Sequence, residues 1–169
     1  MTVDSFRDWE HWQIRFETIY DNKEKKWKAG QITEPLHKVG NTRKHGTLVR
    51  FMPDDTIFEE TRFNADIVRR RLRELAYLNK GAAISFTDER AQAPGNETYV
   101  FCYQGGIADF VSYLNKDKTL LYEKPIVFEA QKDDILLSLA IQYTDAYTES
   151  TYSYVNNIPT PEGGTHETG

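Results

Sequence analysis

Gly46 and Thr47 are the residues whose types and position come nearest to a ligand-binding motif in this sequence. They end a polar segment that begins at Gly40, which invites comparison with a phosphate-binding loop. Such a loop needs four residues between its glycines and then Lys followed by Ser or Thr, whereas five residues intervene here and Thr47 directly follows Gly46. The spacing therefore favours a plain loop that leads into a strand. The Thr47 hydroxyl could orient a carboxylate or a water molecule, but by spacing alone a bond to its own backbone is the favoured role.

Other residues that could do chemistry lack the right neighbours. The single cysteine, Cys102, could form a nucleophile pair with one of the four histidines, but no spacing orders them. It stands between Phe101 and Tyr103 in a strand pattern, which favours a small buried thiol. His166 and Glu167 lack the second histidine at helical spacing that a zinc protease requires. We therefore predict no catalytic residue and no metal ligand in this chain.

The densest basic run could contact phosphates, and it consists of Arg69, Arg70, Arg71 and Arg73. Glu74 lies four residues after Arg70, and the four arginines spread over more than one helical face. This arrangement favours a solvated or interdomain helix surface. The chain has 21 Lys and Arg against 26 Asp and Glu, a net charge of −5, so no overall basic field indicates nucleic-acid binding.

Composition indicates a globular chain that positions these residues in one domain or two small lobes. The sequence has 169 residues, of which 39% are hydrophobic, 28% charged and 13% aromatic. One cysteine excludes an internal disulfide and a multi-cysteine zinc cluster. No stretch approaches the roughly 18 apolar residues of a membrane span, and the first ten residues show no signal-peptide pattern. The cytoplasm is the expected compartment, without a membrane partner.

The first half alternates strands with one strong helix. Period-two alternation predicts a strand over residues 12–20, with residues 27–32 as a hairpin partner and Pro35 interrupting the pairing. Residues 47–52 form a second strand pattern. An apolar stripe near period 3.6 predicts a helix over residues 64–79, with Asn64 as its cap and Gly81 ending it in a left-handed conformation.

The second half reads as short strands, one helix and then a sheet. Strand patterns cover residues 83–87 and 98–103 around a loop at 91–96, and a short helix starts at Ile107 and ends near Asn115. Three further strands are expected at residues 126–130, 135–143 and 148–155. The predicted class is α/β (α+β) with two lobes and a boundary near residues 104–106.

Several segments resemble one family, the B subunits of bacterial DNA gyrase and of topoisomerase IV, the latter called ParE. They occur in the family's order from about Gly30 to Gly169 and read GNTRKHGTLVRFMP (residues 40–53), RLRELAYLNKG (71–81), TDER (87–90), YQGGIADFV and YLN (103–115), and YVNNIPT and EGGTHE (154–167).

The resemblance implies a fold and one site. Residues 1–103 resemble the C-terminal part of a GHKL ATPase domain, the second half of its sandwich. Residues 104–169 resemble the N-terminal part of a ribosomal-S5-like transducer domain. Gly46-Thr47 matches the family's Gly-Thr, whose hydroxyl supports the adenine-reading aspartate through water. The resemblance therefore makes Gly46 and Thr47 the expected cofactor-binding residues in the intact protein.

The family's catalytic glutamate, its magnesium-holding asparagine and its glycine-rich lid have no counterparts among these residues. The chain resembles an internal fragment of an ATP-hydrolysing type II topoisomerase. The resemblance implies further transducer elements after Gly169, so apolar side chains on the strands of residues 126–155 should stay partly uncovered, which favours self-association. We expect the chain to be inactive alone and to bind neither ATP nor Mg²⁺, the cofactors of the intact family protein.

The resemblance also implies partners for the intact enzyme. These are DNA, the gyrase A or ParC-type partner protein, and a second copy joined through the ATPase domain. From Gly106 onward the only cations are four lysines, so DNA affinity of this part should be weak. The alternative function is a non-catalytic binding module that reuses the same fold.

Overall fold

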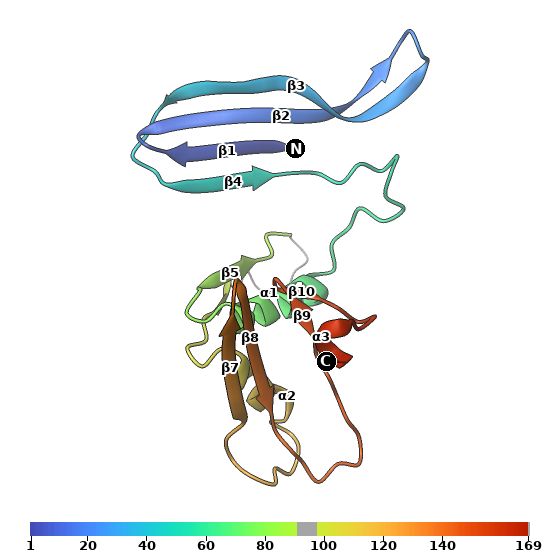
Figure 1. Ribbon diagram of the computed structural model, residues 1–169. Helices are drawn as coiled ribbons and strands as arrows, with labels where there is room; N and C mark the ends of the chain where they lie inside the picture. Colours follow the sequence, from blue (N-terminus) through green and yellow to red (C-terminus); the bar gives the residue numbers. More distant parts are fainter. Residues whose placement is uncertain (91–97, 169) are drawn as a thin grey trace. The chain divides into compact units, whose positions relative to one another are not determined.

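The computed structural model describes residues 1–90 and 98–168 and divides the chain into two compact units, Met1–Phe63 and Asn64–Gly169 (Figure 1). Each unit has its own secondary structure and is described by itself. The units divide the chain at a different place from the domain boundary expected between residues 103 and 104, because helix α1 packs on elements that follow it. A compact unit is not a family domain, so that boundary stays a prediction.

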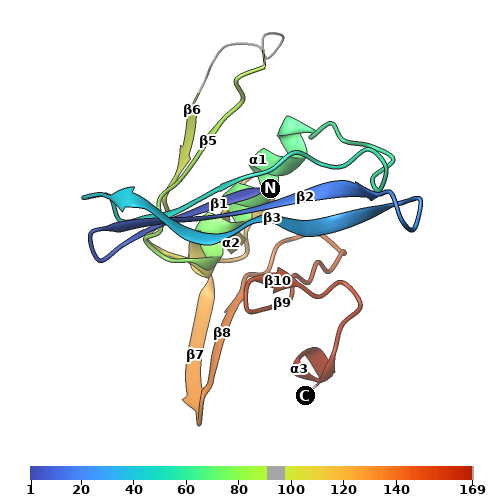
Figure 2. The same ribbon diagram turned by 90° about the horizontal axis from the view of Figure 1, so that it is seen from above.

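The first unit is one antiparallel sheet. Its strands are β1 (Thr2–Arg7), β2 (Glu10–Asp21), β3 (Lys26–Asn41) and β4 (Gly46–Arg50), in the order β3-β2-β1-β4. Figure 2 shows these strands edge-on as a single layer. The predicted strands at residues 12–20, 27–32 and 47–52 fall on β2, β3 and β4, whereas β1 was not anticipated.

Pro35 interrupts the pairing only locally, because it has no partner in β2 but does not end the strand. Strand β3 continues past Pro35 and pairs with β2 on both sides of it, at His37↔Gln13 and Glu34↔Arg15. The register shifts between these pairs, and β3 lies at the edge of the sheet. An edge position and an irregularity are where a strand tolerates a residue without a backbone N–H.

Little of this sheet is buried. Among residues 1–63, all of which the structure describes, only Asp4 is buried, and none is helical. The alternation of β2 produces half-buried rather than buried side chains at Trp12, Ile14 and Phe16. Side chains on both faces of the sheet are therefore at least partly exposed.

The second unit gathers around α1 (Ala65–Leu78) and α2 (Ile107–Leu114), which pack on each other. Its other elements are β5 (Ile84–Thr87), β6 (Thr98–Phe101), β7 (Ile126–Lys132), β8 (Ile135–Ile141), β9 (Tyr154–Val155), β10 (Ile158–Pro159) and α3 (Thr165–Thr168). The strands form three antiparallel pairs, β5-β6, β7-β8 and β9-β10. Its buried apolar side chains are Ala76, Tyr77, Phe101 and Phe110.

Local signals placed α1 correctly. The Asn64 side-chain oxygen accepts hydrogen bonds from the backbone N–H groups of Asp66 and Ile67, at 2.9 and 3.2 Å. Gly81 follows the helix at φ +78°, in the left-handed region that favours glycine. The buried residues of α1 are Ala76 and Tyr77, whereas the leucines of the predicted apolar stripe are half-buried, because the Tyr77 ring packs against Tyr103 and Phe110.

The predicted strand at residues 148–155 is mostly wrong. Only Tyr154 and Val155 pair, with Pro159 and Ile158, across a two-residue turn. Both turn residues, Asn156 and Asn157, have positive φ, which such tight hairpins require and asparagine tolerates. Helix α3 was not anticipated, and the loop expected at residues 91–96 lies outside the described residues.

Strands β7 and β8 form a hairpin that leaves apolar side chains exposed, as expected. Its register runs from Ile126↔Ile141 to Lys132↔Ile135. The exposed apolar side chains of this hairpin are Ile126, Val127, Phe128, Ile135, Leu136, Leu137, Leu139 and Ile141. The hairpin, whose strand β8 contacts α2, therefore leaves much of its apolar surface uncovered.

Candidate functional site

The predicted site residues open strand β4. Gly46 pairs with Phe6 of β1, and Thr47 pairs with Ser5. Gly46 has φ +124°, and a Cβ built on it would meet nothing within 4 Å. Thr47 is exposed, and among the residues that the structure describes no hydrogen-bond partner of its hydroxyl is found. This hydroxyl is therefore free to donate and accept hydrogen bonds.

Alternation along the strands decides which side chains share a face with Thr47. Cross-strand partners lie on the same face, so Ser5 lies beside Thr47, and Val3 and Val49 form the next pair on that face. Val49 is 51% exposed. The Thr47 face thus combines two hydroxyls with apolar surface and stays open to a ligand.

The opposite face carries a buried carboxylate that sequence reasoning missed. The Asp4 carboxylate accepts a hydrogen bond from Gln13 Nε2 at 2.7 Å and one from Arg50 Nη2 at 3.0 Å, and its Oδ1 lies 2.7 Å from His11 Nε2. The Gln13 hydrogen bond, followed by the His11 contact, lowers the pKa of Asp4 below its ordinary value. The ionised carboxylate therefore links β1 to both of its neighbouring strands, β2 and β4. The sequence offered one signal for this carboxylate: an acidic residue stands in the middle of β1, between Val3 and Ser5.

The start of β4 is open. Gly46 and Thr47 offer open backbone and an exposed hydroxyl. Over residues 1–90 and 98–168, no group of three or more His, Cys, Asp or Glu side chains is placed to hold a metal ion. The start of β4 can therefore form hydrogen bonds with a ligand, without a metal centre in the described part.

Among the described residues, no contact joins Cys102 to His166, so the nucleophile pair considered from the sequence does not form there. Cys102 is exposed, so the expected buried thiol is wrong: β6 ends at Phe101, which takes the buried position instead. His166 Nε2 lies 2.7 Å from Ser153 Oγ and 3.1 Å from Thr160 Oγ1. A Cβ at Gly164 would lie 2.7 Å from the His166 ring, which explains why a glycine precedes this segment.

The arginines of α1 are more engaged than a solvated surface would be. Arg71 Nη2 donates to the backbone oxygen of Asn157 at 2.7 Å, and Arg73 Nη1 donates to Tyr113 Oη at 2.6 Å. Arg71 and Arg73 thus form hydrogen bonds with residues far along the chain. A solvated surface is therefore wrong for these two arginines, whereas the interdomain alternative fits them, because their partners Asn157 and Tyr113 follow the boundary expected near residue 104.

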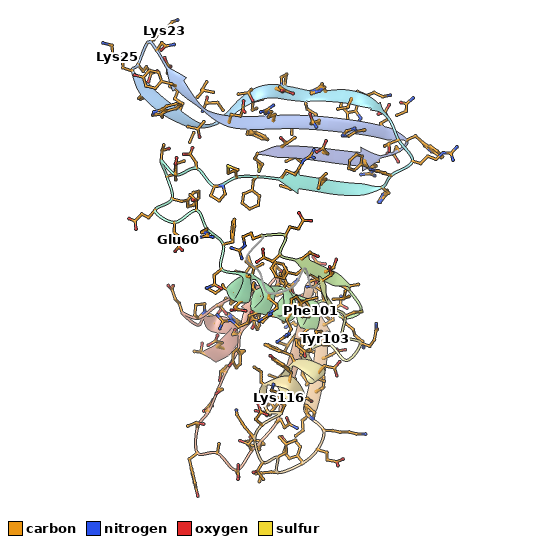
Figure 3. The ribbon with its side chains drawn as sticks, turned by 180° about the vertical axis from the view of Figure 1, so that it is seen from behind. Lys23, Lys25, Glu60, Phe101, Tyr103 and Lys116 are labelled. Atoms are coloured by element: carbon orange, nitrogen blue, oxygen red, sulfur yellow. The ribbon has the colours of Figure 1, made fainter. Side chains whose placement is uncertain are left out.

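Three of the segments noted for their resemblance, residues 71–81, 103–115 and 154–167, meet in the second unit. The Tyr77 ring stacks on Tyr103 at 3.6 Å between centroids and lies 5.2 Å from Phe110. Asn157 Nδ2 donates to Asn79 Oδ1 at 2.9 Å. Figure 3 places the labelled Phe101 and Tyr103 beside the helices of this unit. These segments therefore hold the unit together, and among the described residues they form no cluster that could hold a metal ion.

None of the described helices is long and apolar enough to cross a bilayer.

A sequence-family profile for DNA gyrase B matches residues 106–169. The DNA gyrase B protein of Treponema denticola is 46% identical over 145 residues, which is 85% of this chain and 22% of the relative. The B protein of DNA topoisomerase 4 from Enterococcus faecalis is 48% identical over 143 residues, 83% of this chain and 20% of the relative. The chain thus spans about a fifth of the length of the curated relatives it matches.

Solved structures agree with the sequence matches. The 43K ATPase domain of Thermus thermophilus gyrase B, solved with an aminocoumarin, matches with a TM-score of 0.75 and 35% identity, over 99% of this chain and 42% of that chain. The gyrase B protein from Myxococcus xanthus matches with a TM-score of 0.72 and 25% identity, over 98% and 45%. The mixed α/β class is thereby confirmed. The chain belongs to the family of the B subunits of DNA gyrase and topoisomerase IV.

Proposed function

We propose that this chain serves in the ATPase subunit of a bacterial type IIA topoisomerase, an enzyme that couples ATP hydrolysis to DNA strand passage. Residues 1–103 would supply the later part of the GHKL ATPase domain and residues 104–169 the beginning of the transducer. The main support is the match to a gyrase B ATPase domain over 99% of the chain.

In this proposal the intact enzyme works in the cytoplasm on DNA, as a dimer of gyrase B-type chains with gyrase A or ParC partners. Bound ATP with Mg²⁺ supplies the phosphoryl-transfer chemistry that drives closure. Thr47 would act at the adenine end of the nucleotide, where its open hydroxyl orients a water molecule. Gly46 would leave room beside it, because nothing lies within 4 Å of its position for a Cβ. The 169 residues by themselves would neither bind nor hydrolyse ATP.

A second function, a non-catalytic binding module, draws support from the second unit, whose aromatic core and Arg71 and Arg73 contacts are complete within that unit. An intact ATPase reading frame upstream of this chain would exclude it.

The role of Thr47 is testable in a chimera. The matching 145 residues of the Treponema denticola gyrase B protein would be replaced by those of this chain, since the two are 46% identical. Thr47→Ala should raise the KM for ATP by about 2-fold to 10-fold, the loss of one hydrogen bond. Thr47→Ser should restore the KM. Thr148→Ala, at another exposed threonine, should leave it unchanged. An unchanged KM in Thr47→Ala would remove Thr47 from the nucleotide site.

A further inference from the structure

The tip of the β2-β3 hairpin, residues 20–28, presents two exposed aromatic rings. Tyr20 pairs with Trp27 across the strands, and their centroids lie 5.3 Å apart at 66°. Trp27 is 60% exposed and Tyr20 is 45% exposed. Rings this exposed gain little from folding, since their apolar faces remain in water. The pair is therefore available to an external partner.

The hairpin tip is also locally basic. Lys23, Lys25, Lys26 and Lys28 stand within six consecutive residues of a chain whose net charge is −5. The two acidic residues of the tip, Asp21 and Glu24, both form ion pairs with lysines of the tip. Lys28 Nζ lies 2.6 Å from Asp21 Oδ2 and 2.7 Å from Glu24 Oε1, while Lys26 Nζ lies 2.6 Å from Glu24 Oε2.

This ion-pair network leaves two lysines uncompensated. Among the residues that the structure describes, no acidic partner is found for Lys23 or Lys25, and Figure 3 shows both at the far end of the hairpin. Asp21 also fixes the turn, because its Oδ1 accepts hydrogen bonds from the backbone N–H groups of Lys23 and Glu24 at 2.8 and 3.2 Å. The turn therefore presents two positive charges from an ordered backbone.

The aromatic pair and the two uncompensated lysines lie next to each other along the hairpin, an arrangement that suits one kind of ligand. Alternation places Tyr20 and Trp27 on one face and the Asp21 and Lys28 ion pair on the other, with the free lysines in the loop beyond. Exposed rings that accept unpaired bases, next to lysines that contact phosphates, are the combination that binds single strands. A duplex keeps its base faces stacked and offers such rings nothing to stack on.

We propose that the tip of the β2-β3 hairpin is a binding site for single-stranded nucleic acid. Lys23 and Lys25 contact successive phosphates, and Trp27, supported by Tyr20, stacks on an unpaired base. A membrane surface is a poorer fit, because the two rings lie on the strands behind the turn, and turn residues 22–25 contain no apolar side chain that could enter the lipid. The site is in the first unit and is independent of the nucleotide role proposed for Thr47.

The test is binding of a fluorescein-labelled deoxythymidine oligonucleotide of about 20 residues to the whole chain, by anisotropy over a series of salt concentrations. The slope of log K against log salt should fall in magnitude by about 1.4 in the double variant Lys23→Glu with Lys25→Glu, since two phosphate contacts are lost. Lys118→Glu with Lys124→Glu makes the same charge change at two exposed lysines of the second unit and should leave the slope unchanged.

A second set of variants tests stacking. Trp27→Ala should weaken binding about tenfold, whereas Trp27→Phe should retain most of it. Matching circular dichroism of each variant and the parent confirms that the exposed substitutions leave the fold intact. The proposal is overturned by the absence of oligonucleotide binding or by equal losses in the two lysine pairs. It is also overturned by tighter binding of a matched duplex, or by binding to phosphatidylserine vesicles without binding to the oligonucleotide.

Discussion

At the scale of single residues, Asp4 shows how a carboxylate can organise a sheet that buries little else. It is the single buried residue of the first unit, and its three partners come from β2 and β4. Removing an acceptor that satisfies several donors leaves those donors unpaired, which costs more than one exposed hydrogen bond. Asp4 therefore stabilises the order of the strands.

Asp4 predicts a pH dependence of stability. Its pKa is lowered in the folded chain, chiefly by the Gln13 hydrogen bond, so its contribution is present above its ordinary pKa of 3.8 and is lost as the pH falls through the lower folded value. Asp4→Asn should lower the free energy of unfolding by about 1–3 kcal/mol at pH 7. In urea titrations the difference from the parent should vanish at acid pH.

Asp8→Asn is the matched control for Asp4, because its ion pair with Arg7 joins two strongly exposed side chains. It should leave the stability unchanged at every pH. A difference between Asp4→Asn and the parent that persists unchanged below the ordinary pKa of Asp4 would contradict the electrostatic account.

At the scale of elements, a helix or strand could be predicted from the sequence when residues close along the chain determine it. The α1 helix was predictable because its Asn64 cap and Gly81 exit act within a few residues. The β9-β10 hairpin was missed because two-residue strands carry no periodicity, and Asn157 is held by Arg71 and Asn79 far along the chain. The buried side of α1 likewise depended on partners such as Tyr103, which the helix sequence does not reveal.

The aromatic cluster of α1 should dominate the stability of the second unit. Tyr77 is 4% exposed and contacts three other rings, those of Tyr103, Phe110 and Tyr113. Tyr77→Ala should cost about 3–5 kcal/mol in free energy of unfolding, through lost contacts and a cavity. Tyr147→Ala makes the same substitution at a fully exposed tyrosine and should be near neutral by thermal or urea unfolding. Equal effects of the two substitutions would show that the cluster is wrongly assigned.

At the scale of the whole molecule, the family was predictable from motifs, whereas the candidate site was predictable only through resemblance. Thr47 alone carries no signal that separates it from any hydroxyl that opens a strand. Its interest comes from the family match together with its exposed position beside Gly46. In the structure, the sheet of the first unit buries only Asp4, and the β7-β8 hairpin of the second unit exposes apolar side chains.

The uncovered hairpin predicts self-association of the isolated chain. Strand β8 contains no charged residue, and Ile135 and Leu136 are each 73% exposed, so its edge lacks the usual protection against pairing. Leu136→Lys should shift sedimentation profiles toward monomer. Tyr147→Lys adds the same charge outside the hairpin and should not. A parent chain that sediments as a clean monomer at high concentration would refute this prediction.

The central claim is that this chain supplies working parts of a type IIA topoisomerase, and ATP-dependent supercoiling by the chimera tests it most directly. The chimeric Treponema denticola gyrase B protein, combined with its gyrase A partner and relaxed plasmid, should supercoil DNA only when ATP is present. Sedimentation and circular dichroism would first establish that the chimera is folded and dimeric. A folded, dimeric chimera that neither hydrolyses ATP nor supercoils DNA would contradict the proposed function.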